Sequence, residues 1–212
     1  LCDWSSDVCS SDLGALAWMA TQTRCDMLVV VSEFVGYLAE SENPTVSLLK
    51  RINKAINLVK EADTHLVFKP HGIAHDKLAI AAFHDSSFAN MPGMKSQGGV
   101  FTMLCDIDDL NIIQKYPAKC NEAAKTEASS SHRMKFCPLT ITSSRVKRVA
   151  RSTFAAETLV AVDAMDKAIA LNGMLSELLH GDPKSYRHPA SLFCDCMSVV
   201  ANCQVTCPHQ LE

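Results

Sequence analysis

The sequence lacks any apolar run that approaches the roughly 18 residues of a membrane-spanning helix. No membrane partner is therefore expected. It also has little net charge, since 20 lysines and arginines against 23 aspartates and glutamates leave −3 at pH 7. Any nucleic-acid binding must use local basic patches rather than a globally cationic surface. Neither an internal repeat nor a signal peptide is apparent, which argues against a repeat architecture and against secretion.

The composition is that of a folded protein, with 48% hydrophobic and 20% charged residues. A length of 212 residues suggests one domain with an appendage, or two small domains. Ten cysteines would indicate a disulfide framework mainly in a much shorter secreted chain. Cys105, Cys137 and Cys194 lie in or beside apolar strand-like runs, where a thiol behaves as a small hydrophobic group. We therefore expect a reduced, intracellular protein.

The first residues have no helical or strand periodicity, and a disordered terminus would fit them. Residues 2–13, CDWSSDVCSSDL, resemble the in-frame translation of a widely used short-read sequencing adapter. We therefore predict that residues 1–13 are an artefact outside the fold. They should make few buried contacts, and Trp4 should not be packed among apolar neighbours.

Residues 14–70 show helical periodicity. From Gly14, GALAWMATQTRCDMLVVVSEFVGYLAES has apolar residues at helical spacing and ends in a polar cluster. An Asn-Pro-Thr sequence at 43–45 then opens a second helix, with proline in its first turn. The apolar stripe of this second helix comprises Val46, Leu49, Ile52, Ile56 and Val59. We predict a small helical segment of two packed helices.

The pattern changes near 71–76, where a second domain, 71–212, is expected to begin. Short apolar runs bounded by turn residues predict strands at 78–83, 98–105, 136–142 and 190–194. A long polar excursion, in part ordered, is expected over 106–135. A helix over 154–179 has Thr153 as its predicted N-cap and Gly181 and Pro183 as stop signals, and another helix begins near 198. The prediction is an α/β domain with one mixed sheet, whose last strand is parallel to a central one.

Two aspartates end predicted strands. Asp85 comes at the end of LAIAAFH, and Asp195 follows SLFC directly. Ligands bind at the carboxyl ends of strands in open α/β sheets. Taken singly, either aspartate is as well explained as a turn or helix cap. His84 beside Asp85 suggests a general base, but on the opposite strand face it is expected to be a packed or surface histidine.

A glutamate heads the apolar stripe of the long helix. Glu157 is followed at helical spacing by Ala161, Ala164, Ala168, Leu171 and Leu175. A buried carboxylate costs several kcal/mol unless a partner or metal compensates. Interaction with the helix dipole explains its place in the first turn but not its face. If the three acids converge, their charges repel unless a cation holds them, and oxygen ligands favour Mg²⁺ or Mn²⁺ over zinc.

Five sequence blocks carry a family resemblance. HDSSFANMPGMKSQGGV, TSSRVKRVARSTFAAETLVAVDA and LFCDCMSVV resemble the three successive acidic motifs of RNase H domains in copia-type retrotransposon polyproteins. GALAWMATQTRCDM and TVSLLKRINKAINLVK are similar to the segment that follows the polymerase core in the same polyproteins. The resemblance implies an RNase H-like mixed sheet with flanking helices, cleavage of RNA in RNA:DNA hybrids, and the rest of the reverse transcriptase polyprotein as a partner. It also implies a cytoplasmic particle or the nucleus as the location.

The resemblance also implies roles for residues. Asp85, Glu157 and Asp195 would be three members of an Asp-Glu-Asp-Asp site for two Mg²⁺ (or Mn²⁺) ions, which activate a water and stabilise the departing 3′ oxygen. The hybrid would be recognised by its groove shape, phosphates and 2′-hydroxyls. The basic residues before the long helix would contact phosphates, or would simply form a solvated face: Arg145, Lys147, Arg148 and Arg151.

The sequence departs from the family at several points. Cys25 stands where the family usually has proline, and Cys196 where it has asparagine. The fourth acid is expected beyond Glu212 and the polymerase aspartates upstream, so we expect no polymerase activity and weak or no cleavage by this chain.

Two other interpretations stay open. One is a degenerate retroelement remnant that folds without activity. The other is a zinc-binding interaction module, although its spacing departs from the paired C-x2-4-C pattern. Its ligands would be Cys194, Cys196, Cys203, Cys207 and His209.

Overall fold

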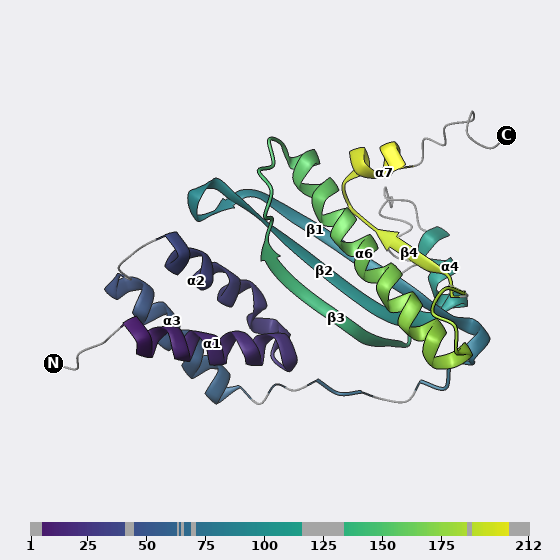
Figure 1. Ribbon diagram of the computed structural model, residues 1–212, viewed down its shortest axis with the longest axis horizontal. Coiled ribbons are helices and arrows are strands. Elements are labelled where there is room, and N and C mark those ends of the chain that lie inside the picture. The colour runs from purple at the N-terminus through teal and green to yellow at the C-terminus, as the bar shows by residue number, and fades with distance from the viewer. Residues whose placement is uncertain are drawn as a thin grey trace, which may run out of the picture. The chain divides into compact units, whose positions relative to one another are not determined.

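The computed structural model describes residues 6–40, 45–62, 64, 66–68, 71–115, 134–185 and 188–203. It shows a mixed α/β protein with a four-stranded sheet and flanking helices (Figure 1). The chain divides into two compact units. Unit 1 comprises Leu1–Val67, Ser86–Gly99 and Ile141–Ala156, and unit 2 comprises Phe68–Asp85, Val100–Thr140 and Glu157–Glu212. None of the described helices combines the length and the apolar character that crossing a membrane requires.

The sheet has the strand order β3-β2-β1-β4. Its strands are β1 (Leu78–Met91), β2 (Lys95–Asp106), β3 (Phe136–Arg145) and β4 (Ala190–Phe193). The short turn η3 (Pro92–Met94) joins β1 to β2, and so short a connection between paired strands requires them to run antiparallel. β4 pairs with β1 in parallel. The predicted mixed sheet, with its last strand parallel to a central one, is therefore confirmed.

The predicted limits are too short for β1, β2 and β3, whereas β4 ends at Phe193, one residue before its predicted end. The range 78–83 covers only the buried beginning of β1, which continues to Met91 through a stretch that is largely exposed. Backbone pairing needs no apolar side chains, so the strand continues after its hydrophobic pattern has ended. β2 likewise begins at Lys95 rather than 98, and β3 continues to Arg145 rather than 142.

The two faces of β1 pack differently, because successive side chains of a strand point to opposite faces. Ile80 and Ala82 pack with Ala168 of the long helix α6 (Thr153–His180), which lies across the sheet in Figure 1. On the other face, Ala79 and Ala81 share a cluster with residues of β2 and of helix α4, namely Met103, Cys105 and Leu110. The sheet of unit 2 is therefore covered on both faces.

Helix α4 (Ile107–Lys115) lies inside the predicted excursion of 106–135 and is an ordered part of it. Residues 116–133 lie outside the described part of the chain. Asp108 and Asp109 in the first turn of α4 complement its helix dipole. A further short helix, α7 (Met197–Cys203), follows β4 close to its predicted start, and η2 (His75–Lys77) precedes β1.

The ends of α6 follow local chemistry. Its N-cap is Ser152 rather than the predicted Thr153, because the Ser152 hydroxyl accepts a hydrogen bond from the Ala155 N–H at 3.1 Å. At the other end, Gly181 has a positive φ of 71°, the left-handed conformation that commonly ends a helix. The predicted stop signal at Gly181 is confirmed.

The helices of unit 1 are α1 (Ser6–Gln22), α2 (Leu28–Glu40) and α3 (Val46–Glu61), with the short turn η1 (Cys25–Met27) before α2. The continuous helix predicted from Gly14 is therefore interrupted. Arg24 explains the interruption, since its buried guanidinium donates to Asp26 and to the Val59 carbonyl of α3. Thr45 caps α3, because its hydroxyl accepts from the Leu48 N–H.

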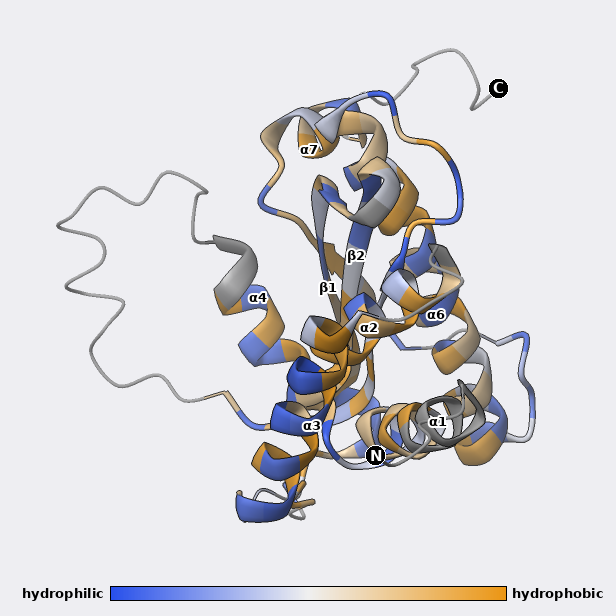
Figure 2. Ribbon diagram, turned by 90° about the vertical axis from the view of Figure 1, so that its left-hand side faces the viewer, coloured by the Kyte–Doolittle hydropathy of each residue, from blue (hydrophilic) through white to orange (hydrophobic). Residues whose placement is uncertain are grey.

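The buried face of α3 differs from the predicted stripe. Leu48, Ile52 and Ala55 are its buried residues, whereas Val46 in the first turn is 68% exposed. Hydrophilic and hydrophobic stretches alternate along α3 in Figure 2, as expected of a helix with one buried face. The buried face differs from the predicted stripe because Leu48 lies one helical turn before Ile52, on the same side of the helix, whereas Val46 does not.

The adapter-like stretch contributes to the helical core of unit 1. Helix α1 begins at Ser6, and Leu13 is 5% exposed in a cluster with Leu16, Met27 and Phe34. The expectation of few buried contacts from residues 1–13 is therefore wrong at Leu13, which continues the apolar face of a helix. Trp4 lies outside the described residues.

Candidate metal centre

Glu157 directly follows the first turn of α6, rather than lying within it as predicted, and is 3% exposed. The helix approaches the sheet through small residues on the same face, Ala161, Ala164 and Ala168, all buried. Their small side chains allow close packing against β1, so a residue that heads this face has to point toward the sheet. The predicted burial of Glu157 is confirmed.

The two aspartates are brought together by the register of the parallel strand pair. Ile80 pairs with Ala190, and the pairing continues to Phe83 with Phe193. Extending the same register brings His84 level with Cys194, and Asp85 level with Asp195. Both pairs therefore lie at the carboxyl end of β4, next to the first turns of α6.

The carboxylates of Asp85, Glu157 and Asp195 converge, each with an oxygen within 4.8 Å of the others. We call these three residues the carboxylate cluster. Glu157 is buried, and the two aspartates are exposed. The predicted convergence is confirmed, and all three residues belong to unit 2.

The donor set fits a hard divalent cation. Three carboxylates at such short range repel one another, and a cation between them removes that repulsion. Because the donors are all oxygens, Mg²⁺ or Mn²⁺ suits the carboxylate cluster better than zinc does. The burial of Glu157 strengthens the argument, since burial weakens the screening of its charge by water.

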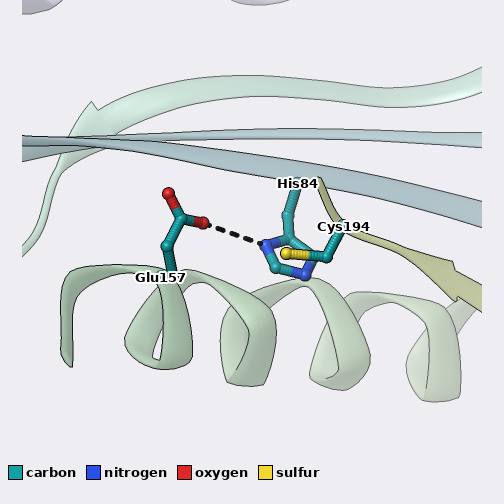
Figure 3. Close-up of side chains that lie close together, drawn as sticks. All are labelled: His84, Glu157 and Cys194. Atoms are coloured by element: carbon teal, nitrogen blue, oxygen red, sulfur yellow. Dashed lines mark ion pairs between the residues drawn. The ribbon is translucent and has the colours of Figure 1, made fainter. Parts of the chain in front are cut away.

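His84 is a neighbour of this cluster that the sequence did not reveal as such. Its Nδ1 lies 3.8 Å from Oε2 of Glu157, and the two side chains are 0% and 4% exposed (Figure 3). Burial lowers the pKa of His84, although the nearby charges of Glu157, Asp195 and Asp85 act in the opposite direction. The expectation of a packed histidine is confirmed, and its ring is neutral at neutral pH.

A second group of metal-ligating side chains includes this histidine. Ligand atoms of His84, Glu157 and Cys194 lie within 4.8 Å of one another. We call these residues the mixed-donor cluster. The sequence signal for it is the pair of dipeptides His84-Asp85 and Cys194-Asp195, which the strand register places side by side.

The cysteines proposed for a zinc module do not gather in the described part of the chain. Cys194 joins the mixed-donor cluster, whereas Cys196 and the exposed Cys203 belong to neither group of possible metal ligands found among the described residues. Cys207 and His209 lie outside the described residues.

The predicted phosphate-binding residues lie in unit 1, and the carboxylate cluster in unit 2. Lys147, Arg148 and Arg151 are exposed between β3 and α6. Arg145 ends β3 half-buried and packs against Gly36, where a Cβ would lie 3.4 Å from its Cδ. Their role in binding nucleic acid stays a prediction.

The fold and the site define a mixed α/β protein with a cluster of three carboxylates at one edge of its sheet. Comparisons with protein families, curated proteins and solved structures find no match for this chain.

Proposed function

We propose that this chain carries the RNase H domain of a copia-type retrotransposon polyprotein and acts on the RNA strand of RNA:DNA hybrids. The observation that carries the proposal is the convergence of Asp85, Glu157 and Asp195, which lie in three separate sequence motifs. Each of these motifs resembles one acidic motif of that family. If the resemblance arose by chance, the three residues that it identifies would not be expected to converge in the fold around the position of one cation.

The fold supports the same proposal. The resemblance implies a mixed sheet with flanking helices, and the chain has a four-stranded mixed sheet in which β4 is parallel to β1. It also implies that Glu157 belongs to the metal site, and Glu157 is a buried residue near the start of α6, the helix that packs on the sheet. A helical segment precedes the sheet in the chain, as in the parent polyproteins.

The three residues of the carboxylate cluster would have different roles. Glu157 is buried and held by α6, so it would be the fixed ligand, while the exposed Asp85 and Asp195 face the solvent from which a phosphodiester approaches. When bound there, Mg²⁺ supplies activation of a water and stabilisation of the leaving 3′ oxygen. Without the cation, three carboxylates repel the phosphates of the hybrid, so substrate binding would itself depend on Mg²⁺.

Recognition of the hybrid would not require base reading. Lys147, Arg148 and Arg151 are exposed cations that would contact phosphates, and the 2′-hydroxyls would distinguish the RNA strand. Affinity would then depend on salt concentration and hardly at all on sequence.

A cleavage assay on a hybrid with end-labelled RNA tests the proposal. Because the fourth acid is expected outside this sequence, cutting of the RNA strand should be weak; it should require Mg²⁺ or Mn²⁺ and should be abolished by Asp85→Asn and by Glu157→Gln. Asp163→Asn is the matched control, because it removes an acid from the exposed face of α6, where Asp163 pairs with Lys167. Cleavage that survives neutralisation of Asp85 would refute the assignment.

Metal binding is measured beside cleavage, because the resemblance implies a fourth acid outside this sequence. Mn²⁺ binding, followed by the loss of the paramagnetic resonance signal of the free ion, should be weakened by Asp85→Asn and by Glu157→Gln. It should be unchanged in Asp163→Asn. If neither cleavage nor Mn²⁺ binding is found, the chain is better explained as a folded remnant without activity.

A further inference from the structure

We infer that the mixed-donor cluster, His84, Glu157 and Cys194, is a second metal site, which binds a borderline divalent cation such as Zn²⁺ and shares Glu157 with the carboxylate cluster. The site differs from the proposed Mg²⁺ site in its chemistry, because it offers one nitrogen, one oxygen and one sulfur. The sharing of Glu157 has consequences only if the carboxylate cluster binds a cation, so that part of the inference rests on the proposed function.

The geometry is close to that of a metal site. The three ligand atoms lie within 4.8 Å of one another, and the nitrogen and oxygen of His84 and Glu157 are 3.8 Å apart. Bond lengths of about 2.0–2.3 Å place the ligand atoms of tetrahedral zinc roughly 3.3–3.6 Å apart. Small side-chain rotations would therefore close the cluster around an ion.

The three side chains also approach from the right directions. Figure 3 shows His84 extending from its strand toward α6, Glu157 extending from α6 toward the sheet, and the sulfur of Cys194 beside the imidazole ring. His84 comes from β1 and Glu157 from α6, which are both long and regular, and Cys194 directly follows β4. Such support holds ligands in place before the metal arrives.

An independent observation points to a missing ligand. Both ring nitrogens of His84 are buried, and neither has a hydrogen-bond partner among the described residues. Buried polar atoms nearly always have a partner, and a metal ion would supply one for the nitrogen that faces Glu157 and Cys194. The 3.8 Å between His84 and Glu157 is too long for a hydrogen bond between them.

The sulfur of Cys194 accepts a hydrogen bond from the backbone. The backbone N–H of Cys196 donates a hydrogen bond to this Sγ at 3.2 Å, which fixes the position of the sulfur. Cys194 is only half-buried, so an ion has a route to the cluster from solvent. The charges of Asp85 and Asp195, close to the same ring, add to the attraction for a cation.

The donor set selects the metal. Sulfur and imidazole ligands favour zinc and similar cations, whereas Mg²⁺ avoids sulfur. An ion held by His84 and Cys194 would draw the Glu157 carboxylate away from the two aspartates. Zn²⁺ at this site should therefore weaken Mn²⁺ binding at the carboxylate cluster. The mixed-donor cluster would thus act as an inhibitory site.

Cobalt is the probe for the experiment, because Co²⁺ replaces Zn²⁺ and its bond to a thiolate gives a charge-transfer absorption band. The full chain, kept reduced, is titrated with Co²⁺, and Mn²⁺ binding is measured in parallel. The band should appear in the native chain and should be displaced by Zn²⁺. No band in the native chain would overturn the inference.

Three variants separate the two clusters. Cys194→Ser should weaken Co²⁺ binding at least about tenfold and abolish the band, with Mn²⁺ binding unchanged. Asp85→Asn should weaken Mn²⁺ binding and keep the Co²⁺ band. Glu157→Gln should weaken the binding of both Co²⁺ and Mn²⁺. A Co²⁺ affinity that Glu157→Gln leaves unchanged would overturn the assignment of that ligand.

Two cysteine controls distinguish this site from a zinc module built from the C-terminal cysteines. Cys196→Ser and Cys203→Ser should keep the band, and its loss in both would instead favour that module. His84→Asn, checked for folding by circular dichroism, should weaken Co²⁺ as Cys194→Ser does. Should Mn²⁺ binding be absent while the band behaves as described, the proposed function fails and the mixed-donor site stands.

Discussion

Nδ1 of His84 lies 3.8 Å from Oε2 of Glu157, and both side chains are almost completely buried. Burial lowers the pKa of His84, so its ring is neutral at pH 7 and does not balance the charge of Glu157. The two aspartates of the carboxylate cluster add further negative charge nearby. Folding and cation binding should therefore be linked.

The first prediction concerns this linkage. In the presence of a chelator, Glu157→Gln should raise the free energy of unfolding by about 1 kcal/mol, because it removes a buried charge that two other carboxylates repel. Adding Mg²⁺ should stabilise the native chain and not the variant. Urea denaturation with and without Mg²⁺ measures both effects.

Asp163→Asn is the control for that measurement, because Asp163 lies on the exposed side of α6 and pairs with Lys167. Its effect should stay within about 0.5 kcal/mol and should not depend on Mg²⁺. If Glu157→Gln proves less stable than the native chain in chelator, the contacts of Glu157 rather than a cation hold it in place.

A second prediction concerns the exposed basic residues before α6. Replacing Lys147, Arg148 and Arg151 together by alanine should weaken binding to RNA:DNA hybrids of any sequence. The slope of log affinity against log salt concentration should fall by roughly 0.9 for each phosphate contact that is lost. Filter binding across a salt series measures it, with Lys54→Ala and Lys60→Ala, exposed on α3, as controls. An unchanged slope would identify the basic run as a solvated face.

Thiol reactivity provides a third prediction. Burial, and then the charges of Asp109 and Asp106, raise the pKa of Cys105 to about 11. At pH 8 roughly one Cys105 thiol in a thousand is then ionised, and the side chain is also inaccessible. Iodoacetamide should modify Cys105 at least about 100-fold more slowly than the exposed Cys203, as followed by peptide mass spectrometry. In urea the two rates should become similar; fast labelling of Cys105 in the native protein would contradict its burial.

The fourth prediction is a pH dependence. The Asp26 carboxylate accepts two hydrogen bonds from the guanidinium of Arg24, which lower the pKa of Asp26 below its usual value of about 3.9. A carboxylate whose pKa is lower in the folded state stabilises the fold above the unfolded value, and this contribution is lost as pH falls through the folded value. Asp26→Asn should therefore lower the melting temperature at pH 7 and have no effect near pH 2.

The size of that effect should be modest. Because the Asp26 side chain is 44% exposed and screened by solvent, the change at pH 7 should be about 1–2 °C. The exposed Asp166→Asn is the control and should melt like the native chain at both pH values. An Asp26→Asn effect that persists unchanged at pH 2 would show that packing, and not the ion pair, is responsible.

Several features of the fold were predictable because they depend on local chemistry. The apolar runs around Ile80 and Leu192 mark strand cores, and the small residues after Glu157 identify the face of α6 that packs on the sheet. The end of α6 at Gly181 follows from the conformational freedom of glycine. The burial of Glu157 was predictable for a related reason, because its position on the apolar face of α6 directs its side chain toward the sheet.

Features that depend on distant contacts were not predictable. The helix break at Arg24 results from a hydrogen bond to Val59 of another helix, and no glycine or proline marks it in the sequence. β1 continues to Met91 because its backbone is paired, although its side chains carry no apolar pattern there. The mixed-donor cluster depends on the register between β1 and β4. The residues around 84 and around 194 do not by themselves determine this register.

The pairing of β1 with β4 joins residues that are far apart in the chain, Ile80 with Ala190 and Phe83 with Phe193. Contacts of such long sequence separation form late, because the loop between them must be closed first. A ribosome adds about 5–20 residues per second, so the helices of unit 1 and the β1-β2 hairpin leave it several seconds before Asp195 does. Nascent chains that end before β4 therefore carry neither metal cluster, and both arise only as β4 emerges and docks.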